Sequence, residues 1–149
     1  MHEENEGKFH FQHDFVCGPD NPSGLHLVLD YHDDYVSCDW TITENFVGYD
    51  GIFHGGIAAS ILDDLMIHAC HNHRKLDVVT ATITVNYRNM AHVGDKIHGE
   101  GRITSWKKGS RAIHTEAKLF AGDRLIADAT GVNVIVKDKI NSTAVVKAT

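Results

Sequence analysis

The sequence predicts an α+β domain in which an antiparallel sheet of about six strands wraps around one central helix. Two observations lead to this prediction. Residues 55–71 form the only long segment with apolar residues at helical spacing, and it is apolar on almost all sides. Six other segments have the length and β-branched composition of strands. Such a sheet and a single apolar helix bury their surfaces best when the sheet curls around the helix.

The chain before the helix predicts a loop followed by a hairpin. Both prolines lie within residues 17–24, where glycine, asparagine and aspartate also favour turns. Residues 25–31 and 35–43 are predicted strands, joined by the polar turn at residues 32–34.

The chain after the helix predicts four more strands. Residues 78–88 alternate strictly, so we expect two faces, one with Ala81, Ile83, Val85 and Tyr87 and the other with Thr80, Thr82, Thr84 and Asn86. The remaining strands are expected at residues 96–106, 112–121 and 125–137, with turns short enough for antiparallel hairpins. The last strand has small residues on one face, which would let the helix approach closely: Ala127, Ala129 and Gly131.

Composition sets the limits of the domain. The chain has 149 residues, 42% apolar and 23% charged, so it can bury a core without disulfides or a structural metal. We expect a domain at residues 15–137, a loosely ordered N-terminal segment at residues 1–14 and a tail at residues 138–149. Cys17, Cys38 and Cys70 are odd in number and widely spaced, which predicts reduced thiols.

Charge and hydropathy argue against several classes of protein. A net charge of −6 opposes binding to nucleic acid or to an anionic membrane surface. Apolar runs fall far short of the ~20 residues of a spanning helix. The acidic N-terminus lacks the apolar core of a signal peptide. We therefore expect a cytoplasmic protein without a nucleic-acid or membrane partner.

No metal site is predicted, although the chain has twelve histidines. His68, Cys70, His71 and His73 gather towards the end of the helix, but they lack the paired spacing of a closed zinc site. Histidine near a helix C-terminus is also favoured by the helix dipole alone. The motifs of serine hydrolases, P-loop proteins and dinucleotide-binding proteins are absent from the sequence.

The start of the helix is the first candidate site. Gly55 and Gly56 follow His54, and a glycine pair here forms either a tight turn or a set of free N–H groups that can hold an oxyanion. His54 would either brace this turn through its ring or contact the substrate. Asp63 lies among apolar residues in the middle of the helix, where an ionised carboxylate is costly without a partner. Either a structural or a chemical role fits Asp63.

Helix geometry separates these candidates. Gly55 and Asp63 are eight residues apart, or about 12 Å along the helix axis. One chain therefore cannot direct both groups at one carbonyl. Two antiparallel copies of the helix can do so across a two-fold axis, which gives two equivalent sites. An active site built from these residues requires a dimer.

Several passages resemble a known family, the hotdog-fold acyl-CoA thioesterases of the phenylacetate-pathway and human thioesterase-superfamily type. The resemblance covers roughly residues 15–137, and its most specific part is His-Gly-Gly followed by an aspartate nine residues after the histidine. It is carried by residues 17–25, by residues 51–56 with Leu62-Asp63, by Val79-Thr80-Ala81 and by Asn86-Tyr87-Arg88.

This resemblance implies a hotdog fold, homodimers and often dimers of dimers. It also implies hydrolysis of an acyl-CoA thioester without a cofactor other than the coenzyme A of the substrate. Gly55 would supply the oxyanion N–H, Asp63 from the other subunit would be nucleophile or general base, and Thr80 would orient water or the carboxylate. Several relatives carry a side-chain amide or other polar group seven residues before the first glycine, where this chain has Gly48.

Basic residues are candidates for coenzyme A phosphates: Arg88, Lys107, Lys108 and Arg111. Solvated surface charge is the alternative explanation for each of them. Two other functions remain open, a hotdog-fold enoyl-thioester hydratase or dehydratase and a non-catalytic acyl-CoA-binding module. The residues do not select an acyl group.

Overall fold

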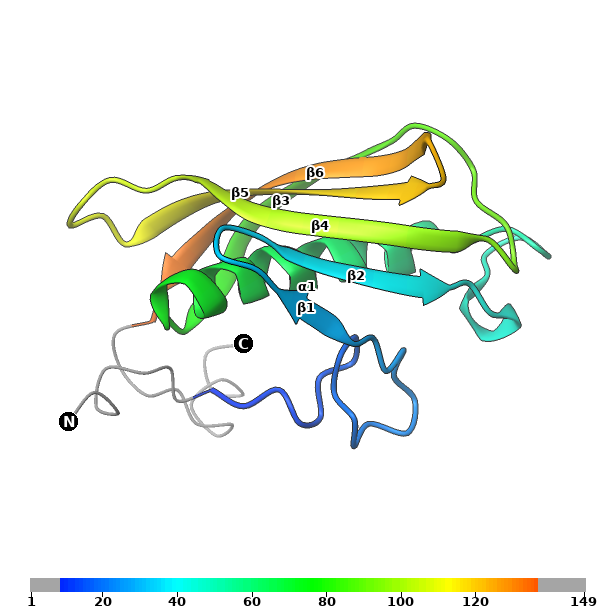
Figure 1. The fold of residues 1–149 in the computed structure, drawn as a ribbon, viewed down its shortest axis with the longest axis horizontal. Coiled ribbons are helices and arrows are strands. Elements are labelled where there is room, and N and C mark those ends of the chain that lie inside the picture. Colours follow the sequence, from blue (N-terminus) through cyan, green and yellow to red (C-terminus); the bar gives the residue numbers. More distant parts are fainter. Residues whose placement is uncertain (1–8, 137–149) are drawn as a thin grey trace.

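The computed structural model describes residues 9–136 and confirms the predicted hotdog architecture, with a sheet curled over one long helix (Figure 1). The elements are β1 (Leu29–Tyr31), β2 (Val36–Thr41), the short 3₁₀ helix η2 (Glu44–Phe46), α1 (Gly55–Arg74), β3 (Val78–Tyr87), β4 (Lys96–Ser105), β5 (Ala112–Ala121) and β6 (Arg124–Ile135).

All neighbouring strands of the sheet are antiparallel, in the order β1-β2-β4-β5-β6-β3. The predicted hairpin of β1 and β2 is present, with Leu29 opposite Cys38. β3 pairs only with β6, so one edge of this ten-residue strand is free within the described chain. An unpaired strand edge of this length is a ready template for another strand.

The core lies between α1 and the concave face of the sheet (Figure 1). The helix residues that face the sheet are almost completely buried: Ile61, Leu62, Leu65, Met66 and Ala69. A side chain at Gly101 would place its Cβ 2.7 Å from the backbone oxygen of Leu65, so glycine in β4 permits the close packing of helix and sheet. Gly131 in β6 has the same role beside Met66, as the small residues of that strand predict.

Two element boundaries differ from the prediction by three residues or more. The strand expected at residues 25–31 is reduced to β1, because Leu25 and Leu27 bond to the carbonyls of Phe15 and Val16 in the preceding loop. His26 between them has a positive φ of 54°, which breaks the extended conformation. The helix extends to Arg74, three residues beyond the prediction, and Lys75 ends it in the left-handed conformation.

The predicted faces of β3 are confirmed from Thr82 to Tyr87 but are wrong at Thr80, because the strand contains a bulge. Its pairing with β6 shifts between Thr80 and Thr82, which leaves Ala81 without a partner. The extra residue changes the alternation, so Thr80 faces the helix along with Ile83 and Val85. Strict alternation would place Thr80 on the opposite face from them.

The expected tail at residues 138–149 lies outside the described residues, as do residues 1–8 of the expected N-terminal segment. Cys17, Cys38 and Cys70 are free thiols. Within residues 9–136, no helix has the length and apolar character to cross a membrane.

Candidate functional site

The N-terminus of α1 is capped by the side chain of His54. Its Nδ1 atom accepts hydrogen bonds from the N–H groups of Gly56 at 2.8 Å and Ile57 at 3.3 Å. A Cβ at Gly56 would lie 2.8 Å from the His54 ring, so glycine at this position makes room for the imidazole. The cap satisfies two of the free N–H groups at the start of the helix. These hydrogen bonds are the ring contacts that a bracing role for His54 requires.

Gly55 keeps a free N–H group beside this cap. Its N–H has no acceptor among residues 9–136, while its carbonyl accepts a hydrogen bond from the Tyr87 hydroxyl at 2.8 Å. A cavity of about 230 Å³ opens next to Gly55 and includes Tyr87, Arg88 and Met90 in its wall. The helix dipole adds partial positive charge at this end. The free N–H can therefore bind an oxyanion that enters the cavity.

Asp63 is half-buried in the middle of α1 and has a polar partner. The Thr80 hydroxyl donates a hydrogen bond of 2.6 Å to its Oδ1 atom. Burial raises the pKa of Asp63, and the hydrogen bond from Thr80 opposes this shift. Oδ2 makes no hydrogen bond to any described residue, which leaves one carboxylate oxygen available to a ligand.

A buried chain of polar groups supports Thr80. Thr115 donates to the Oδ1 atom of Asn133 at 2.6 Å, and the Asn133 amide donates to Thr80 Oγ1 at 3.5 Å. Both Thr115 and Asn133 are 1% exposed or less. Each hydrogen bond in this series is donated in the direction of Asp63. The Asp63 carboxylate is therefore the final acceptor of the series. The sequence analysis missed Asn133 and Thr115, whose polarity at buried strand positions was the only available signal.

The predicted site residues separate into two groups within one chain. His54, Gly55 and Gly56 lie at the start of α1, whereas Asp63 and Thr80 meet two helical turns further along. No described residue links the Gly55 N–H to the Asp63 carboxylate. A Cβ at Gly48 would lie in van der Waals contact with the His54 ring, at 3.7 Å. Glycine itself offers no polar side chain to either group.

The predicted phosphate-binding residues are also divided. Arg88 lines the cavity next to Gly55, where Asp128 binds its guanidinium at 2.8 Å. Lys107 and Lys108 occupy the turn after β4, at the opposite end of the sheet. Arg111 follows this turn and donates to the Ile135 carbonyl at 3.0 Å. Only Arg88 of the four is close to Gly55 in the same chain.

A second polar group lies on another face of α1, away from Asp63. Asp64 and His68 are buried there, and the Cys17 thiol from the N-terminal loop reaches them. Burial, followed by the Asp14 carboxylate, raises the pKa of Asp64 to about 8. Burial also lowers the pKa of His68 to about 4 and raises the pKa of the Cys17 thiol. Of the histidine-rich group noted in the sequence, His68 and Cys70 are buried, and the side chain of His73 lies outside the described part.

Comparison with protein families identifies the fold independently. The family model of the thioesterase superfamily matches residues 50–127, which is more than half of the chain. The chain belongs to the thioesterase superfamily. The matched segment begins before the His-Gly-Gly turn and includes Asp63 and Thr80, so the candidate site lies within the region that defines the superfamily.

One sequence relative of this thioesterase-superfamily chain comes from Pseudomonas aeruginosa and is provisionally described as an esterase. The two are 30% identical over 93 residues, which are 61% of this chain and 68% of the relative.

Solved structures share the fold of this superfamily member. A protein described as a thioesterase superfamily member has a TM-score of 0.74 at 25% identity; the match covers 83% of this chain, which spans 60% of that protein. The Escherichia coli PaaI protein from the phenylacetic acid degradation operon has a TM-score of 0.67 at 18% identity, with 74% and 83% of the two chains covered. A Streptococcus pneumoniae hypothetical thioesterase, solved with coenzyme A, has a TM-score of 0.65 at 17% identity, with 76% and 88% covered.

The cap predicts the effect of replacing His54. His54→Ala removes the acceptor for Gly56 and Ile57 and should cost about 1 kcal/mol of the free energy of unfolding, or about 2–4 °C in melting temperature. His54→Asn should recover most of this loss, because asparagine is a good N-cap residue. Thermal unfolding followed by circular dichroism measures both variants. Equal destabilisation by alanine and asparagine would contradict the capping role.

Proposed function

We propose that this chain hydrolyses an acyl-CoA thioester to a carboxylic acid and free coenzyme A. The observation that carries the proposal is the free N–H of Gly55 at the positive end of α1, in a fold that also holds a half-buried carboxylate at Asp63. An oxyanion donor and a carboxylate are the two groups that thioester hydrolysis needs. The family, and with it thioesterase chemistry as a class, supports the assignment.

Gly55 would act on the thioester carbonyl. As a nucleophile adds to the carbonyl carbon, negative charge develops on the carbonyl oxygen. A positioned N–H therefore stabilises the transition state more than it stabilises the bound substrate. One such donor is typically worth roughly 100- to 1,000-fold in rate. The cap at His54 holds the first turn rigid, so the Gly55 N–H needs no rearrangement as the charge forms.

Asp63 would provide the nucleophile or the base. It either attacks the carbonyl carbon and forms an anhydride that water then hydrolyses, or it removes a proton from the water that attacks. In both routes the C–S bond breaks and coenzyme A leaves as a thiolate, which takes up the proton released by the attacking water to give the free thiol. Thr80 fixes Oδ1, and the free Oδ2 oxygen is the reacting atom.

The site would be shared between two subunits. Gly55 and Asp63 are fixed about 12 Å apart on one helix, so the two cannot meet within one chain. The free edge of β3 supports a dimer, because pairing of two such edges about a two-fold axis brings the two copies of α1 side by side and antiparallel. The proposal includes the association of two such dimers into a tetramer. It also places the protein in the cytoplasm.

Coenzyme A would enter beside Gly55. Arg88 lines the cavity there and is the candidate for a phosphate contact. To bind a phosphate, its guanidinium would either leave the Asp128 carboxylate or bind both groups at once. The other basic candidates lie at the opposite end of the sheet from Gly55 of their own chain: Lys107, Lys108 and Arg111. They would therefore contribute to the site that contains Gly55 of the partner subunit. The Streptococcus pneumoniae structure with coenzyme A supports a ligand of this kind for the fold.

The first test is thiol release from a panel of acyl-CoAs of different chain length and aryl character. The wild-type protein should release coenzyme A from at least one of them, and Asp63→Asn should reduce the rate by at least about 100-fold, because the amide neither attacks nor accepts a proton. Asparagine still accepts the hydrogen bond from Thr80, so the fold should be kept.

Each other outcome of this panel selects a different function. Unchanged activity in Asp63→Asn would remove Asp63 from the mechanism. Hydration of an enoyl-CoA without thiol release would favour the hydratase. Tight binding of acyl-CoA without either reaction would favour a binding module, for which the missing polar group at Gly48 is an argument.

The role of the Gly55 N–H can be tested with a matched pair of variants. Proline fits the first position of a helix and lacks an N–H, and His54 before it already has the extended conformation that proline requires, with φ −68° and ψ 127°. Gly55→Ala places a Cβ at the same point but keeps the N–H. We expect kcat of Gly55→Pro to be about 100- to 1,000-fold below that of Gly55→Ala. Equal rates would exclude this N–H as the oxyanion donor.

A further inference from the structure

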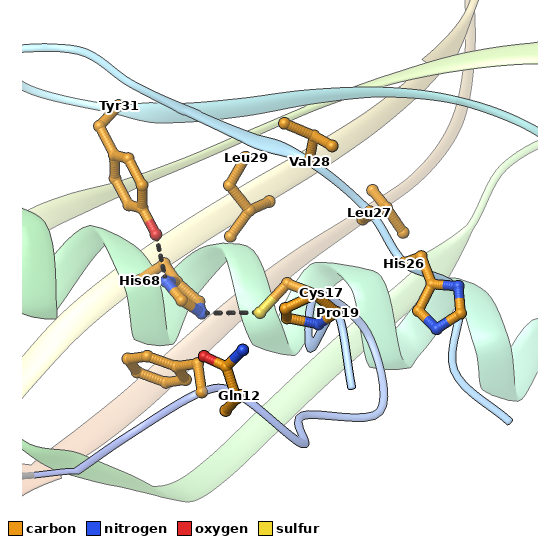
Figure 2. A pocket seen from close by; sticks show the side chains of 10 residues that line it. Gln12, Cys17, Pro19, His26, Leu27, Val28, Leu29, Tyr31 and His68 are labelled. Carbon is orange, nitrogen blue, oxygen red and sulfur yellow. Dashed lines mark hydrogen bonds between the residues drawn. The ribbon is translucent and has the colours of Figure 1, made fainter. Parts of the chain in front are cut away.

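Three potential metal ligands from two distant parts of the chain meet on the face of α1 that carries Asp64. The Nε2 atom of His68 lies 3.4 Å from the Cys17 sulfur and 3.5 Å from the Oδ2 atom of Asp64. All three ligand atoms lie within 4.8 Å of one another. Figure 2 shows Cys17 and His68 pointing at each other at the wall of a cavity of about 420 Å³.

These distances fit a tetrahedral metal ion. With ordinary zinc–ligand bond lengths, tetrahedral geometry separates sulfur from nitrogen by about 3.6 Å and nitrogen from oxygen by about 3.3 Å. The two distances from His68 Nε2 are each within about 0.2 Å of these values. Thiolate, imidazole and carboxylate together form a donor set that zinc commonly takes.

The Asp64 carboxylate lacks the partner that its burial requires. The residue is 4% exposed, and its Oδ2 atom receives no hydrogen bond from any described residue. Asp14 adds a second carboxylate nearby, and neither aspartate forms an ion pair with lysine or arginine within residues 9–136. A buried, unpaired carboxylate oxygen costs several kcal/mol unless a proton or a cation satisfies it.

The other nitrogen of His68 is held as a metal ligand requires. Its Nδ1 atom lies 2.9 Å from the Tyr31 hydroxyl, and the dashed lines of Figure 2 show His68 bonded to Tyr31 on one side and Cys17 on the other. A hydrogen bond at Nδ1 fixes the ring and leaves Nε2 free to bind a metal.

A catalytic triad fits this arrangement less well. Cys17 and His68 alone resemble a nucleophile and its base. In such a triad, however, the carboxylate bonds the ring nitrogen that is remote from the nucleophile. Here Asp64 and Cys17 both face Nε2, so three donors converge on one point.

We propose that Cys17, Asp64 and His68 bind a divalent transition metal ion, with zinc as the expected occupant. The ion would tie the N-terminal loop to α1 and supply the missing partner of Asp64. Cys17 and His68 line the cavity, so the fourth coordination position opens towards it and would take water or a ligand. Residue spacing does not predict this site, because 46 residues separate Cys17 from Asp64 and no paired spacing results.

The test uses cobalt as a spectroscopic probe of the untagged, chelator-treated protein with its thiols kept reduced. The wild-type protein should bind one Co²⁺ per chain and develop the absorption of a cobalt–thiolate bond. Zn²⁺ should displace the cobalt. Cys70→Ala is the matched control, since it removes a buried thiol from α1 and leaves Cys17, Asp64 and His68 in place. It should keep the absorption, whereas Cys17→Ala should lose it and Asp64→Asn should bind at least about 10-fold more weakly.

Two results of the cobalt titration would overturn the proposal. One is the absence of a cobalt–thiolate absorption in the wild-type protein, and the other is an unchanged absorption in Cys17→Ala. Alkylation of the wild-type protein provides a second readout that needs no variant, with the modified cysteines located by mass spectrometry. Zn²⁺ should slow the alkylation of Cys17 by at least about 10-fold, and an unchanged rate would also refute the site.

Discussion

The burial of one apolar helix against a curled sheet is the constraint on which the rest of this structure depends. α1 fits closely against β4 because Gly101 leaves room for the backbone at Leu65. A helix packed in this way cannot rotate or slide without opening the core. Every functional group on it is therefore fixed in position, including the Gly55 N–H at its start and the Asp63 carboxylate in its middle. In the proposed mechanism, each of these two groups therefore needs its counterpart from another chain.

Polar groups within this apolar contact are supported by neighbours from distant strands. Asp63 is held by Thr80, which is supported in turn by Asn133 and Thr115 in the interior of the sheet. Without these donors, a half-buried carboxylate would be driven towards its neutral form by desolvation. Asp64, one residue further along, has no comparable support for its Oδ2 atom. Adjacent residues on one helix therefore have different requirements, a hydrogen-bond chain for Asp63 and a proton or a cation for Asp64.

The sequence predicted the elements whose signals are local. Helical spacing, strand alternation and short turns were enough for α1 and for the succession of strands along the chain. The His-Gly-Gly turn and Asp63 were the sequence signals for the candidate site. The bulge at Ala81 was not predictable, because neither glycine nor proline marks it, and it decides which way Thr80 faces. Asn133 was missed because its partners are set by strand register, which depends on the whole sheet. The separation of Arg88 from Lys107 does follow from antiparallel order, since consecutive strands end at opposite ends of the sheet.

Sharing of the site between subunits is most directly measured by co-expressing Gly55→Pro with Asp63→Asn. In a mixed dimer one site receives Gly55 from the Asp63→Asn chain and Asp63 from the Gly55→Pro chain, whereas the other site lacks both groups. Random pairing makes half of the dimers mixed, each with one intact site, so thiol release should recover to about one quarter of the wild-type rate. If each site lay within one chain, both chains would carry a defective site. Activity no greater than that of the two single variants would then contradict the shared site.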